Sequence, residues 1–89
     1  MKYVYTVTMN RWADPENHHY LMGVFTSLET ALCVALENSR WRAYKYEPYI
    51  EMFELDGKEH SVICKTTRQA TQLLSEVNPG KVAEIYENE

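Results

Sequence analysis

The sequence predicts an α+β fold, an antiparallel sheet of about five strands with two helices on one face. The segment Tyr20–Asn38 is the main observation, because a short apolar run passes there directly into a helical pattern. A second helical stripe follows Thr66, and Asp56-Gly57 between the two helices is a strong hairpin signal. These features predict the order β-β-α-β-β-α-β, whose last six elements are ferredoxin-like, with a differently ordered α+β sheet as the alternative.

The first predicted helix begins just after Phe25. The Thr26 hydroxyl can accept a backbone N–H of the first turn, and Glu29 stands three residues later, as in a capping box. The helix should end near 38–42. Apolar residues fall at the spacing of one helix face: Leu28, Ala31, Leu32, Ala35 and Leu36.

Period-two alternation and apolar runs bounded by turn residues predict the strands. The expected strands are Lys2–Asn10, Tyr20–Phe25, Tyr49–Leu55, Glu59–Lys65 and Val82–Tyr86. The polar segment Arg11–His19 is an expected loop, which makes the first strand an edge or hairpin partner of the second. Asp56-Gly57 predicts a type I′ turn.

A second capping box predicts that the second helix begins at Thr66, with Gln69 three residues on. Asn78-Pro79-Gly80 should end this helix, since it offers a left-handed cap and a helix breaker. Its apolar stripe is Ala70, Leu73, Leu74 and Val77.

Length and composition indicate a single domain over residues 1–89, with 45% apolar and 25% charged residues. The net charge of −4 disfavours nucleic acid as a partner, because such binding depends on clustered basic residues. A membrane helix needs roughly 20 apolar residues, and the longest apolar runs are far shorter. Cys33 and Cys64 are expected to be reduced thiols, with a disulfide left open. A strand follows Met1 at once, so we expect no signal peptide and a cytoplasmic location.

Two groups of residues could carry chemistry. The histidines His18, His19 and His60 could bind a metal, but they lack ligand spacing. Acid–base catalysis could use the carboxylates of Glu51, Glu54, Asp56 and Glu59, although a solvated hairpin surface is the simpler interpretation. We therefore expect no enzymatic activity, no metal and no cofactor.

The most distinctive surface candidate is dense in aromatic and basic residues, the types that dominate interface hot spots. Its members are Arg40, Trp41, Arg42, Tyr44, Lys45 and Tyr46. They could bind a protein, or they could stack on and pair with a nucleotide or phosphate. The competing interpretation is that Trp41 and Tyr44 cover the end of the core while the cations stay solvated.

The segments Phe25–Ala31 and Tyr49–Gly57 resemble small uncharacterised bacteriophage proteins. Those proteins carry an N-terminal strand, a "gvFss.e.A" junction and an acidic strand ending in Asp-Gly, and the resemblance covers roughly Tyr3–Gly57. The shared motifs are structural, so they carry over no catalytic residue. What the resemblance implies is a phage accessory protein that inhibits or redirects host machinery, including defence systems.

The leading hypothesis is therefore a non-enzymatic anti-defence protein that binds a host protein in the host cytoplasm. The alternative is a protein that binds or sequesters a nucleotide-like small ligand. A homo-oligomer stays open.

Overall fold

The computed structural model describes residues 2–87, which form four strands and three helices. The strands are β1 (Tyr3–Arg11), β2 (His19–Phe25), β3 (Tyr46–Glu54) and β4 (His60–Cys64). The helices are α1 (Leu28–Trp41), α2 (Thr67–Val77) and α3 (Pro79–Glu87).

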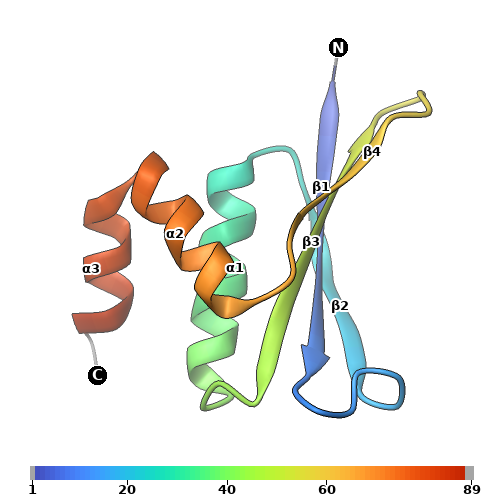
Figure 1. Cartoon of the computed structure of the whole chain (residues 1–89). Coiled ribbons are helices and arrows are strands. Elements are labelled where there is room, and N and C mark those ends of the chain that lie inside the picture. Colours follow the sequence, from blue (N-terminus) through green and yellow to red (C-terminus); the bar gives the residue numbers. More distant parts are fainter. Residues whose placement is uncertain (1, 88–89) are drawn as a thin grey trace.

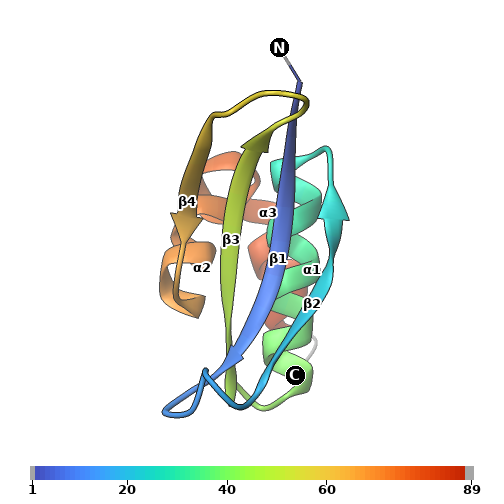
Figure 2. The same cartoon turned by 90° about the vertical axis from the view of Figure 1, so that its right-hand side faces the viewer.

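The strands form one antiparallel sheet in the order β2-β1-β3-β4. All three helices lie on one face, and the opposite face, here called the open face, is turned toward the viewer in Figure 2. The α+β class and the antiparallel sheet are as predicted, but the ferredoxin-like order is not confirmed. The first strand pairs with the second as an antiparallel hairpin, as predicted, but it is not at an edge, because β1 lies between β2 and β3 and its Val7 and Met9 are fully buried.

The core fills the space between the sheet and α1, and α2 packs onto both. Figure 1 shows α3 on the far side of the helical layer from the sheet. The stripes predicted for both helices largely face this core, although Val77 at the end of α2 is exposed. In the core cluster, the apolar side chains with no exposed surface are Val7, Met9, Ala31, Leu32, Ala35, Leu36, Ile50, Ala70 and Leu74.

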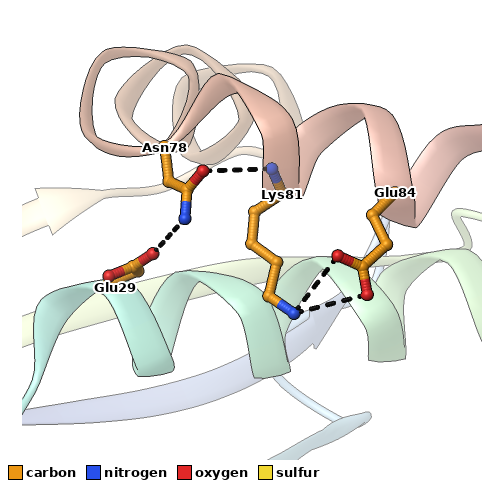
Figure 3. A network of polar contacts seen from close by, with 4 residues as sticks. All are labelled: Glu29, Asn78, Lys81 and Glu84. Carbon is orange, nitrogen blue, oxygen red and sulfur yellow. Dashed lines mark hydrogen bonds and ion pairs between the residues drawn. The ribbon is translucent and has the colours of Figure 1, made fainter.

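The prediction of a last strand over Val82–Tyr86 is wrong, because this segment belongs to α3. Asn78 and Pro79 end α2, but without the predicted left-handed cap, because Asn78 has a φ of −155° and no described glycine has a positive φ. They also begin the next helix. The Asn78 side-chain oxygen accepts the Lys81 backbone N–H at 3.3 Å, and Pro79 takes the first helical position, where a missing N–H costs nothing. The Asn78 amide also donates to Glu29 on α1 at 2.7 Å, which ties the new helix to the first one (Figure 3).

The predictions for the first N-cap and for the β3–β4 hairpin turn need correction. The N-cap of α1 is Ser27 and not Thr26, since the Ser27 hydroxyl accepts the Thr30 N–H at 3.2 Å; the N-cap of α2 is Thr66, as predicted. Asp56 has a φ of 60° while the described glycines have no positive φ, so the hairpin lacks the two left-handed residues of a type I′ turn.

The third strand begins at Tyr46, earlier than Pro48 suggested. Pro48 lies opposite Met9 of β1, and β4 pairs with β3 only from Ile50 onward. The proline therefore sits beyond the end of β4, where its missing N–H removes no ladder hydrogen bond on that side.

Both cysteines are free, and Cys64 is buried whereas Cys33 is partly exposed. Burial raises the pKa of both thiols, that of Cys64 to about 11, so both stay protonated near neutral pH.

We expect iodoacetamide to alkylate the folded protein at Cys33 alone, slowly, and Cys64 only after unfolding, as read by mass spectrometry. A reductant should leave the melting temperature unchanged. A loss of roughly 2–4 kcal/mol of stability on reduction would contradict this, because it would indicate a disulfide.

Candidate binding site

The aromatic–basic segment lies at the end of the molecule where α1 finishes and β3 starts, at the bottom of Figure 1. The connection is a tight turn in which Ala43 and Tyr44 have φ values of 55° and 61°. Left-handed backbone costs a non-glycine residue on the order of 1–2 kcal/mol. Two backbone hydrogen bonds hold the strained turn, from the Ala43 N–H to the Arg40 carbonyl at 2.9 Å and from the Tyr44 N–H to the Ser39 carbonyl at 2.8 Å.

Ser39 anchors this turn to the rest of the fold. It is fully buried, and its hydroxyl donates to the Tyr46 carbonyl at 2.9 Å while lying 3.0 Å from the Thr67 hydroxyl. The end of α1, the start of β3 and the start of α2 are thereby held together, which fixes the side chains that follow. A buried hydrogen-bonded polar group of this kind favours one arrangement of the chain over others.

The Arg42 guanidinium carbon lies among three aromatic rings. It is 5.3 Å from the ring centroid of Tyr20, 5.1 Å from that of Trp41 and 5.2 Å from that of Tyr46. Tyr20 and Tyr46 also contact each other at 5.3 Å between centroids, and the Tyr20 hydroxyl donates to the side-chain oxygen of Asn38. Each cation–π contact contributes about 0.5–1 kcal/mol at an exposed site, so the three rings restrain the guanidinium before any partner arrives.

A surface pocket of about 450 Å³, here called the basic pocket, opens beside this cluster. Its lining residues are Arg11, Trp41, Arg42, Ala43, Lys45 and Tyr46. Three of these described lining residues are cations and none is acidic, so the lining itself is positively charged although the chain has a net charge of −4. Cations beside aromatic rings in a concave site are suited to binding an anionic group attached to a flat or apolar body.

A second pocket, of about 500 Å³, lies between α1 and α3 and is also lined by Trp41. It is lined by Glu37, Arg40, Trp41, Glu84 and Ile85, so its charges are mixed. Trp41 thus belongs to both pockets. It is 76% exposed and Tyr44 is 43% exposed, so the interpretation that these two rings cover the core is wrong. Tyr46, in contrast, packs against the core.

The structure distributes the predicted site residues over two pockets and adds two residues to the site. Trp41, Arg42, Lys45 and Tyr46 line the basic pocket, Arg40 lines the other one, and Tyr44 lines neither. Sequence reasoning missed Arg11 and Tyr20. Arg11 ends β1 directly opposite Tyr46, and the β1–β2 pairing places Tyr20 at the same end. Only the strand register reveals both residues.

The other candidate groups do not converge. In the loop before β2, the His18 Nε2 atom lies 3.7 Å from the Asp14 Oδ2 atom. The Nδ1 atom of His19, the first residue of β2, lies 2.9 Å from the Pro15 carbonyl oxygen. His60 lies on β4, where it is 2.6 Å from Glu51 and stacks on Phe53 with centroids 4.5 Å apart. Within residues 2–87, His, Cys, Asp and Glu side chains form no group of three or more that could hold a metal ion.

Of the carboxylates near the hairpin, Glu59 accepts a hydrogen bond from the Tyr3 hydroxyl at 3.1 Å. Glu51 and Glu54 lie on opposite faces of β3, as their spacing predicted.

None of the helices in the described part of the chain has the length and apolar character needed to cross a membrane. Comparison with protein-family models, curated proteins and solved structures gives no match for this chain. Function is therefore inferred from the residues and their geometry.

Proposed function

We propose that this is a non-enzymatic binding protein of the phage accessory type, which acts in the host cytoplasm. It binds an acidic surface of a host protein, with an immune-defence effector as the leading candidate, and thereby inhibits or redirects that protein. The observation that carries the proposal is the Arg42 guanidinium held among three rings next to an exposed Trp41.

This arrangement suits a protein interface for two reasons. Trp, Tyr and Arg contribute most of the binding energy at interfaces, and they do so best where they are already fixed in position. The strained turn and the Ser39 hydrogen bonds supply that fixed position. Positive charge in the basic pocket further favours an acidic partner and should accelerate association at low salt.

The second candidate function is binding of a nucleotide-like small ligand. It is favoured by the volume of the basic pocket, about 450 Å³, which lies within the range of small-molecule sites. In this case the cations would pair with phosphate, and Trp41 or Tyr46 would stack on the base.

A capture experiment with matched lysine variants tests the first proposal. Lys45 lines the basic pocket, whereas Lys58 is exposed in the turn between β3 and β4 at the other end of the sheet. We expect host proteins captured by the wild type and by Lys58→Ala to be lost with Lys45→Ala, and captured protein to be released as salt rises. Equal capture by both variants would contradict the basic pocket as the interface.

Thermal melts with added ligand separate the second function from the first. A nucleotide binder should gain stability by RT ln(1 + [L]/Kd) when ATP, GTP or a cyclic dinucleotide is added, and Lys45→Ala should lose that gain. A protein inhibitor should not respond to these ligands.

A further inference from the structure

Along its whole length, the edge strand β2 lacks the residues that would block pairing with a further strand. Its seven residues, His-Tyr-Leu-Met-Gly-Val-Phe, include no Lys, Arg, Asp, Glu or Pro, the residues that usually block edge-to-edge pairing. The opposite edge, β4, has only five residues and lies between the charged Glu59 and Lys65. In the sheet formed by residues 2–87, β2 is the terminal strand, at the right-hand margin of Figure 2, so its outward backbone groups face no further strand.

An irregularity in the β1–β2 pairing places two apolar side chains together on the open face. Leu21 lies opposite Thr8 and Val24 opposite Thr6, although Leu21 and Val24 are three residues apart. A regular strand would turn such a pair to opposite faces, but the extra residue Met22 shifts the alternation. Leu21 is 60% and Val24 is 56% exposed.

We propose that β2 pairs antiparallel with β2 of a second copy of this chain, about a twofold axis between Met22 and Gly23. In this register Leu21 lies opposite the partner's Val24 on the open face. Tyr20 lies opposite the partner's Phe25 on the helix-covered face. The bulge is what makes this register self-complementary, because residues 20–25 then meet residues of the same face throughout.

The dimer joins two four-stranded sheets into one of eight strands. Because the two β2 strands run in opposite directions, the two basic pockets lie at opposite ends of the assembly and stay accessible. The two paired β2 strands contain no Lys, Arg, Asp or Glu, so no like charges from these residues meet across the interface. Each copy nevertheless has a net charge of −4. Salt should therefore strengthen the dimer by screening repulsion, whereas it should weaken binding of an acidic partner to the basic pocket. This proposal stands apart from the proposed function.

Mass measurement by analytical ultracentrifugation gives the first test. We expect twice the 10.5 kDa chain mass at high protein concentration. Leu21→Lys should shift the protein to monomer without loss of fold, because Leu21 is mostly exposed. Val62→Lys, on β4 at the other edge of the same open face, should remain dimeric. A wild type that is monomeric up to about 1 mM, or dissociation by Val62→Lys alone, would overturn the proposal.

Cross-linking tests the register itself. Leu21→Cys and Val24→Cys are made separately, each with Cys33→Ser, and oxidised alone or as a mixture. Opposed residues in an antiparallel pair have Cα atoms about 4.5–5.5 Å apart, within reach of a disulfide. We expect a covalent dimer in the mixture and little in either protein alone. Equal cross-linking in all three samples, or none in the mixture, would overturn the register.

Discussion

Leu32→Asp should leave the protein largely unfolded at room temperature. Leu32 has no exposed surface and lies in the second turn of α1, within the core cluster that the helix shares with the sheet. A buried carboxylate without a partner costs several kcal/mol, or forces the chain open to reach water. A domain of this length has a total stability of roughly 5–13 kcal/mol, so the substitution removes most or all of it. Circular dichroism melts and amide NMR dispersion measure the loss.

The matched control is Leu55→Asp, which makes the same chemical change at a half-exposed position in the turn between β3 and β4. Its backbone N–H bonds to the Lys2 carbonyl at 2.8 Å, a contact that the substitution keeps. We expect a change of less than about 1 kcal/mol there. An unchanged melting temperature for Leu32→Asp would mean that the helix presents a different face to the sheet.

Trp41→Ala should reduce affinity for the captured host protein at least about 30-fold, or about 2 kcal/mol, while the fold survives. The ring is mostly exposed and ends α1, so its removal leaves no buried cavity. Arg42→Ala should weaken binding by a similar factor, because it removes the cation around which Tyr20, Trp41 and Tyr46 are arranged. Titration calorimetry beside thermal melts separates affinity from stability.

Trp12 provides the control for nonspecific binding by an exposed aromatic side chain. It is 71% exposed, in the loop just after β1 at the same end of the molecule, but it does not line the basic pocket. Trp12→Ala should retain affinity within a few fold. Full affinity of both stable variants, Trp41→Ala and Arg42→Ala, would place the interface elsewhere, with the acidic strand around Glu51 as the next candidate.

The sequence alone predicts the local elements best where several signals agree. The α1 stripe and the Thr66 cap are examples: regular apolar spacing identifies the buried face of α1, and Thr66 with Gln69 identifies the start of α2. The prediction is wrong where one motif is compatible with two structures. Asn78-Pro79 can end a helix or begin one, and the bond from Asn78 to Glu29, formed only when α1 is adjacent, favours the beginning.

The candidate site also has one part that the sequence reveals and another that only the fold reveals. The clustering of Arg42, Trp41 and Tyr46 is visible in the sequence because these residues are neighbours along the chain. That the guanidinium lies against Tyr20, and that Arg11 adds a third cation to the pocket, depends on β1 lying between β2 and β3.

The sequence by itself determined the class of fold, the helix faces and the position of the basic segment, because these depend on interactions among residues close in the chain. The strand order, the bulge that brings Leu21 and Val24 to one face, and the composition of the pocket were decided by tertiary structure. These features depend on pairing between distant strands, whose register is selected by burying Val7, Met9 and Ile50 together.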